Sequence, residues 1–364
     1  MTSLFCGIVG LPNVGKSTLF NALTSSAIAA SNYPFCTIDP NVGIVQVPDK
    51  RLQVLSDMSH SKKIVPAVMK FVDIAGLVKG ASEGEGLGNK FLANIRECTA
   101  IIHVVRCFDN PDVVHVAGAA DPIQDVEVVN LELVLSDLQM IDNAISRVEK
   151  LVKGKPELKI VLAVLYKARE CLQNGKWVRT LHLTKEEEEA IAAYPFLTSK
   201  KVLYCANVGE GESTSSEKEK LRKLEAYAAA EGNSVIAICA RVEQELIELP
   251  EAERTAMLEA LGLQESGLER FIKASYNLLG LISFLTAGEQ ETRAWTIPAG
   301  MTAQEAAGKI HTDISKGFIR ANVVSYDDMV RYGGRVKARE AGRERAEGKD
   351  YFVQDGDVIL FMHN

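Results

Sequence analysis

Short apolar runs alternate with a segment of helical periodicity in the first part of the chain. The runs that predict buried strands are Leu4–Val9, Val68–Ile74, Ala100–Val105, Val202–Ala206 and Val235–Cys239. Between the first two, Ser17–Leu23 carries Leu19, Phe20 and Leu23 at helical spacing. Buried strands that alternate with helices are typical of an α/β fold with a doubly wound, mostly parallel sheet.

A longer helical pattern begins after about residue 130. Apolar residues recur at steps of three and four from Val134 to Val152 and again from Leu158 to Leu172, and Lys153–Pro156 forms a turn between them. This spacing predicts an antiparallel helical hairpin with a coiled-coil seam. Two ordinary amphipathic helices packed on the main domain are the alternative interpretation.

The last part of the chain predicts a small mixed sheet with one helix. Arg293–Ile297, Phe318–Tyr326 and Val358–Phe361 are strand-like, and a capping box from Thr302 opens a helix that continues to Ile310. We expect the basic stretch 331–349 to be a solvated, partly mobile loop. Together these patterns predict the domain boundaries of the chain. A nucleotide-binding domain is expected at 1–130 and 200–280, the inserted hairpin at 131–199 and the last domain at 281–364.

Composition narrows the class of protein. The 364 residues are 47% hydrophobic and 24% charged, which indicates a globular chain rather than a disordered one. No apolar run reaches the length of about 18 residues that a membrane span needs. Seven scattered cysteines without a CxxC pair favour a cytoplasmic location. The net charge of −7 argues against a coat of nucleic acid, and we expect no recognition of a DNA sequence.

Gly10–Ser17 matches the P-loop pattern GxxxxGK[ST] between a predicted strand and a predicted helix. In such a loop, backbone N–H groups surround phosphate oxygens at a helix N-terminus. The expected nucleotide-binding residues here are Asn13, Val14, Gly15, Lys16, Ser17 and Thr18. Lys16 would neutralise the β and γ phosphates as a catalytic residue, and the Ser17 hydroxyl would bind Mg²⁺.

Two further segments fit a magnesium-dependent nucleotide site. The apolar strand that ends in Asp73 is followed by Gly76, as in a Walker B and switch II arrangement. Asp73 would hold Mg²⁺ through water, and Thr37 lies where a switch I loop would supply a second hydroxyl to the metal. A turn threonine is the alternative interpretation of Thr37.

The base-binding motif differs from that of ordinary GTPases. After the strand Val202–Ala206, the chain has Asn207-Val208-Gly209-Glu210 in place of Asn-Lys-x-Asp. The missing aspartate is the group that accepts hydrogen bonds from guanine. Adenine instead offers one donor and one acceptor, which suit backbone groups near Asn207 and Val208. The motif therefore argues against guanine more firmly than it argues for adenine.

The chain resembles the YchF, or Obg-like, ATPase family of P-loop proteins. The segments that carry the resemblance are Gly10–Ser17, Asn32–Asn41, Asp73–Ala81, Asn207–Glu210, Arg293–Pro298, Ala307–Asp313 and Lys316–Ile319. The resemblance implies a nucleotide domain, an inserted α-helical hairpin and a C-terminal TGS domain with a β-grasp-like sheet. It also implies a preference for ATP over GTP and association with ribosomes, with the large subunit as the expected contact.

Basic residues gather in two places in this acidic chain. Those of the hairpin are Arg147, Lys150, Lys153, Lys155, Lys159, Lys167 and Arg169. Those of the TGS segment are Arg331, Arg335, Lys337, Arg339, Arg343, Arg345 and Lys349. With the resemblance, this clustering predicts contact with the ribosome or RNA through both surfaces. A charge-balanced helix exterior is the alternative for the hairpin.

The water-orienting residue of many GTPases is missing, because Leu77 follows Gly76 where a glutamine would stand. The resemblance points instead to His115, whose imidazole can hydrogen-bond a water near neutral pH. Asn13 adds K⁺ as a second candidate cofactor, since GTPases with asparagine at this position can bind it. We therefore expect an ATP-hydrolysing switch, with a GTPase of the same fold or an ATP-bound regulatory module of negligible turnover as alternatives.

Overall fold

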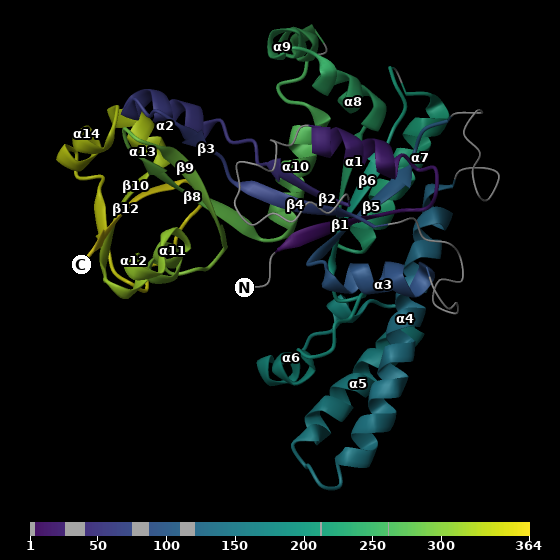
Figure 1. The fold of residues 1–364 in the computed structure, drawn as a ribbon. Helices are drawn as coiled ribbons and strands as arrows, with labels where there is room; N and C mark the ends of the chain where they lie inside the picture. Colours follow the sequence, from purple (N-terminus) through teal and green to yellow (C-terminus); the bar gives the residue numbers. More distant parts are fainter. Residues whose placement is uncertain (1–3, 26–40, 75–86, 110–120, 212, 261) are drawn as a thin grey trace. The chain divides into compact units, whose positions relative to one another are not determined.

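The computed structural model describes residues 4–25, 41–74, 87–109, 121–211, 213–260 and 262–364 (Figure 1). They fall into two compact units. Of these residues, the first unit contains 4–25, 41–43 and those from 71 to 268, and the second contains 44–70 and 269–364. Within the described ranges, none of the helices combines the length and the apolar character that a membrane span requires.

The first sheet has six strands in the order β2-β4-β1-β5-β6-β7. Their bounds are β1 (Phe5–Val9), β2 (Val42–Gln46), β4 (Val68–Asp73), β5 (Ala100–Arg106), β6 (Lys201–Asn207) and β7 (Ser234–Ile238). The pairs β1–β5, β5–β6 and β6–β7 are parallel, and every residue of β5 is buried. A strand covered on both faces needs a continuous apolar run. The predicted doubly wound, mostly parallel sheet is therefore confirmed.

Helices of the first unit lie between these strands along the chain or follow the last of them. They are α1 (Lys16–Ser25), α3 (Leu87–Glu97), α7 (Ser215–Ala230), α8 (Ala240–Glu248), α9 (Glu251–Ala260) and the start of α10 (Gly267–Leu278). Parallel strands end at one edge of a sheet, where ligands of open α/β sheets bind. The segments that follow β1, β5, β6 and β7 therefore meet there.

The predicted helical hairpin is confirmed. It consists of α4 (Pro122–Leu151) and α5 (Leu158–Gln173), which lie side by side in Figure 1, followed by α6 (Lys185–Ile191). The expected seam is the core of the hairpin, with Ile141, Ile145, Val148, Leu165, Ala168 and Leu172 all buried in one cluster. The first helix begins at Pro122, earlier than the expected boundary at 131, because Asp121 caps it by accepting from the N–H groups of Ile123 and Gln124.

Buried Asp137 anchors the hairpin to the segment that returns to the sheet. The Asp137 carboxylate is fully buried on α4 and accepts hydrogen bonds from Leu197 N at 3.0 Å, Thr198 N at 2.8 Å and Thr198 Oγ1 at 2.7 Å. Arg96 of α3 lies 3.4 Å from it. Burial raises the pKa of Asp137, while these hydrogen bonds and the Arg96 charge oppose that shift. One carboxylate thus joins three separate segments.

The second unit is built on a mixed sheet of order β11-β10-β12-β8-β9-β3. Its strands are β3 (Ile64–Val65), β8 (Leu281–Ala287), β9 (Thr292–Pro298), β10 (Phe318–Ser325), β11 (Arg345–Glu347) and β12 (Asp357–His363). Its helices are α2 (Arg51–Ser59), α11 (Ala303–Ile310), α12 (Thr312–Lys316), α13 (Tyr326–Tyr332) and α14 (Arg335–Glu340). The predicted capping box of Thr302 and Glu305 opens α11, whose alanines pack on the sheet.

The structure differs from the expected domain division at residues 44–70, which group with the second unit. Strand β3 pairs in parallel with β9, matching Ile64 with Thr292. Arg51 forms an ion pair with Asp355 at 2.7 Å, and Ser61 donates to the Gly288 carbonyl at 2.8 Å. Partners more than 200 residues away along the chain therefore decide where this segment belongs.

The expectation of a mobile basic loop at 331–349 is wrong. This stretch contains α14 and β11. Arg335 forms an ion pair with Glu344 at 2.8 Å and donates to the carbonyls of Asn322 and Val358. Because the Arg335 guanidinium has several fixed acceptors, it holds the surrounding chain in a defined conformation. The cluster of basic residues in this stretch therefore did not indicate a loop.

Candidate functional site

The predicted P-loop connects β1 to α1 in a conformation that depends on its glycines. Gly15 has a φ of +90°, and a Cβ there would lie 2.0 Å from the Asn207 amide nitrogen. A Cβ at Gly10 would lie 2.7 Å from the Val104 carbonyl oxygen. Both positions require a residue without a side chain because other strands approach the loop closely. The loop is therefore held against β5 and β6 at the start of α1, where free N–H groups favour anions.

Lys16 and Asp73 lie together at this end of the sheet. The Lys16 ammonium forms an ion pair with the Asp73 carboxylate at the end of β4, and the Lys16 residue is only 9% exposed. Ser17, the next residue of α1, is exposed. The structure therefore brings the P-loop lysine and the strand-end aspartate together.

The donors at this end of the sheet fit a magnesium ion. Mg²⁺ prefers carboxylate, hydroxyl and phosphate oxygens, which Asp73, Ser17 and a nucleotide provide. Among the described residues, no group of three or more His, Cys, Asp or Glu side chains could hold a metal. The fit therefore depends on a bound nucleotide. Thr37, the third expected ligand, lies outside the described residues, as do Leu77 and His115.

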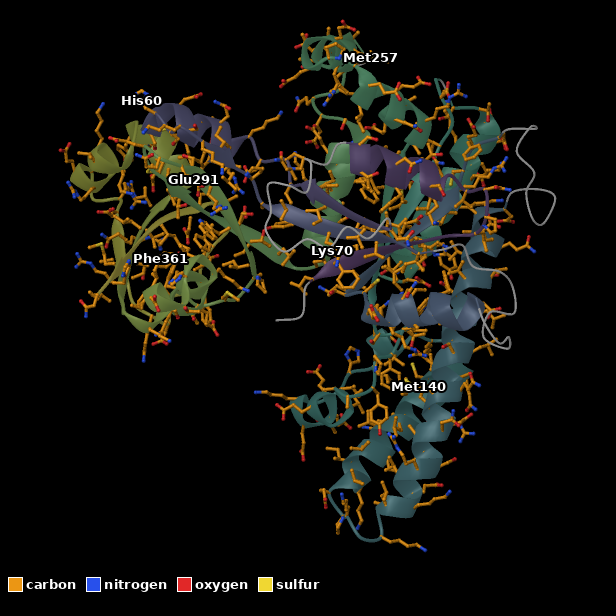
Figure 2. The ribbon with its side chains drawn as sticks, in the orientation of Figure 1. His60, Lys70, Met140, Met257, Glu291 and Phe361 are labelled. Carbon is orange, nitrogen blue, oxygen red and sulfur yellow. The ribbon has the colours of Figure 1, made fainter. Side chains whose placement is uncertain are left out.

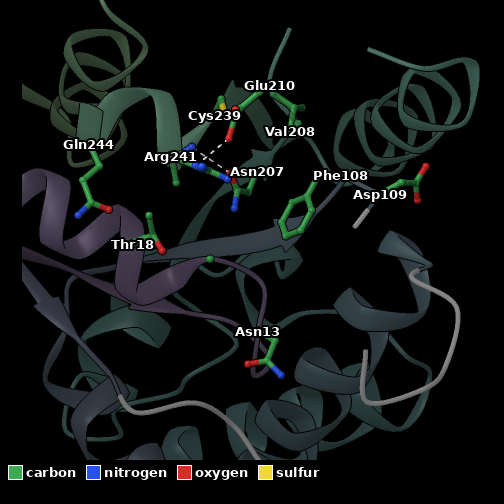
Figure 3. A pocket seen from close by; sticks show the side chains of 13 residues that line it. Asn13, Thr18, Phe108, Asp109, Asn207, Val208, Glu210, Cys239, Arg241 and Gln244 are labelled. Carbon is green, nitrogen blue, oxygen red and sulfur yellow. Dashed lines mark hydrogen bonds and ion pairs between the residues drawn. The ribbon is translucent and has the colours of Figure 1, made fainter. Parts of the chain in front are cut away.

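A cavity of about 640 Å³ adjoins the P-loop (Figure 3). Asn13, Gly15 and Thr18 line it from the loop and α1, and residues 207–210 line it from the end of β6. The rest of its wall comes from Phe108, Asp109, Cys239, Ala240, Arg241 and Gln244. The phosphate motif and the base motif, almost 200 residues apart, thus share one cavity.

Asn207 positions the cavity wall. Its amide nitrogen donates to the Val14 carbonyl at 2.9 Å, and its amide oxygen accepts from Ala240 N at 3.1 Å. The N–H of Val208 donates to the Ile238 carbonyl at 3.0 Å, so this group is used within the sheet. Of the backbone groups near Asn207 and Val208 that were expected to meet the base, the Val208 N–H is thus already used, although Val208 lines the cavity.

Glu210 does not face the cavity as an unpaired acid. Its carboxylate lies 2.9 Å from the Arg241 Nε (Figure 3). The Arg241 Nε also lies 3.4 Å from the Glu245 carboxylate. Because Glu210 and Arg241 are both largely exposed, the ion pair contributes little stability. The carboxylate that follows Gly209 in the base motif thus has a cationic partner in this structure.

Gly209, whose role the motif left open, makes a close contact. A Cβ there would lie 2.6 Å from the Glu217 carboxylate. Glu217 completes the capping box of α7 with Thr214 and also accepts from the Asp109 N–H at 2.9 Å. A side chain at Gly209 would push on this network, so the position affects the cavity through α7.

Phe108 is a site residue that the sequence reasoning missed. Figure 3 shows its ring directed toward the space beside Asn207 and Val208. The Arg106 guanidinium lies 4.5 Å from the ring centre, and Lys220 pairs with the next residue, Asp109. That hydrogen bond from Lys220 lowers the pKa of Asp109. An aromatic residue two positions after the end of a buried strand was the available signal for a surface on which a base can stack.

Two other titratable groups of the first unit, one within β5 and one after β7, are neutral near pH 7. Burial lowers the pKa of His103 on β5 to about 3, so this histidine is uncharged at neutral pH and has no solvent-facing proton to exchange. Burial also raises the pKa of the Cys239 thiol in the cavity wall. Neither group adds charge to the cavity.

Comparison with known proteins gives full-length matches. A family described as "50S ribosome-binding GTPase" matches residues 5–156, and YchF-GTPase_C, described as "Protein of unknown function (DUF933)", matches residues 281–364. The Bacillus subtilis (strain 168) protein named Ribosome-binding ATPase YchF is 52% identical over 364 residues, which cover 100% of both chains. An Escherichia coli O157:H7 protein of the same name is 53% identical over 361 residues, or 99% of both.

A solved structure agrees with this. The Schizosaccharomyces pombe YchF GTPase has a TM-score of 0.86 and 35% sequence identity, and the match covers 100% of this chain and 98% of that one. The fold described above is therefore shared with this relative over almost the whole length of both chains.

Proposed function

Since the chain belongs to the YchF family of P-loop proteins, we propose that it hydrolyses ATP to ADP and phosphate as a nucleotide-dependent switch that binds the ribosome in the cytoplasm. The observation that carries the proposal is the single cavity that joins the P-loop to the Asn207 motif. Ribosome binding is part of the name of the curated relatives. The S. pombe relative is named a GTPase, so the base must be tested directly.

In the proposed site, the backbone of Asn13 to Thr18 holds the phosphates, and Lys16 neutralises charge that develops during transfer. Ser17, Thr37 and Asp73 would hold Mg²⁺, which supplies Lewis-acid stabilisation of phosphate oxygens when bound. Lys16 and Asp73 are already paired, so nucleotide and metal binding would exchange that pair for contacts with ligand. The base would lie between Phe108 and residues 207–210.

We expect ATP to bind more tightly than GTP, and the motif can be tested by restoring guanine-type residues. The double substitution Val208→Lys with Glu210→Asp shortens the acid and weakens its pairing with Arg241. The ratio of the dissociation constants for GTP and ATP should then move toward GTP at least about fivefold, since a restored hydrogen-bond acceptor discriminates strongly. Fluorescent nucleotide titration measures both constants.

Glu245→Asp is the matched control. Glu245 also pairs with Arg241 but does not line the cavity, so its shortening should leave the ratio unchanged. Equal affinity of the unchanged protein for ATP and GTP would contradict the proposed base preference.

For the ribosome contact, we propose the exposed lysines at the tip of the hairpin. Lys150, Lys153 and Lys155 are exposed and, among the described residues, have no ion-pair partner. Reversal of all three charges should lower co-sedimentation with ribosomes at least about tenfold while ATP hydrolysis persists, because each lost phosphate contact removes counterion release. Binding of the unchanged protein should also fall steeply as salt rises.

Reversal of three exposed basic residues of α7, namely Lys218, Arg222 and Lys223, gives the same change in net charge away from the hairpin. That control should co-sediment as the unchanged protein does. Equal losses in both triple variants would point to a general effect of charge rather than to the hairpin. The binding of separated subunits tests the large subunit as the contact.

His115 is proposed to orient the attacking water. His115→Ala should lower kcat for ATP hydrolysis by about 10- to 100-fold without weakening ATP binding, since general acid–base or water-orienting groups contribute at about this level or above. His182→Ala, which removes an exposed histidine from the hairpin segment, should have no effect.

Phosphate release measured in K⁺ and again in Na⁺ tests the proposed K⁺ at Asn13. A rate that is the same in both salts would exclude K⁺, and an unchanged rate in His115→Ala would exclude the histidine.

A further inference from the structure

A second cavity lies beside α4, where this helix passes α3 and the segment that leads into β6. We call it the α4 groove. Its volume of about 590 Å³ is close to that of the nucleotide cavity, and the two share no lining residue. Figure 2 marks its position through Met140 on α4. The principal lining side chains are those of Leu92, Gln139, Met140, Asn143, Arg147 and Tyr194.

The α4 groove has an apolar floor and a polar rim. Leu92 and Met140 contribute apolar surface, and Gln139 and Asn143 contribute exposed amides that can donate and accept. The half-buried Tyr194 ring lies beside Phe196, with 6.4 Å between the ring centres. A flat aromatic ring next to paired amide groups suits a planar ligand with hydrogen-bonding edges.

The charge of the groove is positive. Arg147 is exposed and has no hydrogen-bond or ion-pair partner among the residues the structure describes. The acids that neighbour it on α4 are engaged elsewhere: Asp142 pairs with Arg169 at 3.1 Å, and Glu149 accepts from the Tyr166 hydroxyl at 2.6 Å. The groove therefore favours an anionic ligand.

Arg96 also lines the groove, on the side of α3. Its guanidinium donates to Ser136 Oγ and to the Pro195 carbonyl, both at 2.8 Å. The nearby Asp137 carboxylate is fully buried and has donors from Leu197 and Thr198. No unpaired carboxylate in the described wall is thus left to repel an anion. Because Arg96 and Asp137 pair with each other, the positive potential of the groove comes from Arg147.

The same face of α4 continues from the groove to the hairpin tip. Gln139, Asn143, Arg147 and Lys150 follow one another at steps of three and four, which places them on one side of a helix. Lys153 and Lys155 come next, in the turn. A polyanion seated in the groove would therefore meet successive cations along this ridge.

We propose that the α4 groove holds one unpaired nucleotide of an RNA. The base lies on Tyr194 and the apolar floor, its edge meets Gln139 and Asn143, and its phosphate lies near Arg147. The neighbouring phosphates follow the ridge toward Lys150. A base in a duplex cannot enter, because its edge is paired and its faces are stacked. The proposal deepens the proposed ribosome contact of the hairpin and rests on it.

The test measures fluorescence anisotropy of the full chain with two probes: a short, labelled, mixed-sequence RNA single strand, and the same strand annealed to its complement. The unchanged protein should bind the single strand at least about fivefold more tightly, because only unpaired bases offer a stacking face. Tyr194→Ala should remove this preference and leave duplex binding as it was. Arg147→Glu should weaken the binding of both probes at least about fivefold, because the phosphate contact is common to them.

Because Tyr194 also packs against the hairpin core, a second variant removes the site without removing a core side chain. Ala93 is exposed at the groove wall, and Ala93→Trp fills the space. This variant should lose the single-strand preference as Tyr194→Ala does. The matched control is Lys218→Glu, which reverses an exposed cation on α7 and should bind both probes as the unchanged protein does.

Several outcomes overturn the proposal. The first is that the unchanged protein binds single strand and duplex with equal affinity. The second is that the preference for single strand survives in Ala93→Trp. The third is that a poly-glutamate peptide displaces the single strand at a lower concentration than unlabelled RNA does. The last result would assign the groove to an acidic protein segment. Co-sedimentation with ribosomes separates this proposal from the proposed hairpin contact. If charge reversal at Lys150, Lys153 and Lys155 abolishes ribosome binding while the groove variants bind as the unchanged protein does, the hairpin contact is supported and the groove proposal is overturned.

Discussion

Lys16→Ala should lower kcat for ATP hydrolysis by at least about 100-fold, the effect of removing one fixed electrostatic donor from a developing negative charge. The buried position of Lys16 explains the size of this effect. Its ammonium lies beside Asp73 in a site with little exposure to water, where charge interactions are weakly screened. Phosphate release at saturating ATP measures the change, and titration with ATP shows separately how far binding weakens.

Lys218→Ala is the control for Lys16→Ala, because it removes an exposed lysine of the same unit. Its kcat should match that of the unchanged protein. If the unchanged protein turns over ATP no faster than Lys16→Ala, the protein is a binding module that holds ATP without hydrolysing it. If GTP is turned over faster than ATP, the protein is a GTPase of the same fold.

Asp137→Ala should lower the free energy of unfolding of the first unit by about 3–5 kcal/mol, the usual cost of breaking a buried, hydrogen-bonded charge pair. The substitution leaves the N–H groups of Leu197 and Thr198 buried without their acceptor and removes the ion-pair partner of Arg96. Each unpaired donor adds to the cost.

Urea unfolding can follow this unit separately, because the chain has only two tryptophans. Trp177 lies in the hairpin segment of the first unit and Trp295 in the second. In a Trp295→Phe background, tryptophan fluorescence therefore reports on the first unit. Asp142→Ala, on the same helix but at an exposed ion pair, should cost less than about 1 kcal/mol. A loss below that level in Asp137→Ala would show that its hydrogen bonds contribute little.

The features that the sequence predicted correctly are those encoded by neighbouring residues. The apolar run of β5, the seam of the hairpin and the capping box at Thr302 each follow from side-chain spacing within one element. The P-loop motif can be read in the same way, because its glycines and Lys16 follow one strand and open the next helix. Its glycines also depend on distant partners, since Val104 and Asn207 leave no space for a side chain at Gly10 and Gly15.

The tertiary structure decided what depends on distant partners. Residues 44–70 join the second unit because β3 pairs with β9 across more than 200 residues of sequence. Gly209 is constrained by Glu217, and Glu210 by Arg241. Phe108 became a site residue only when β5 was placed next to β6. Periodicity and motif spacing indicate which residues of a short segment are buried or exposed. They do not indicate which two segments meet, because strand pairing and packing over the whole chain decide that.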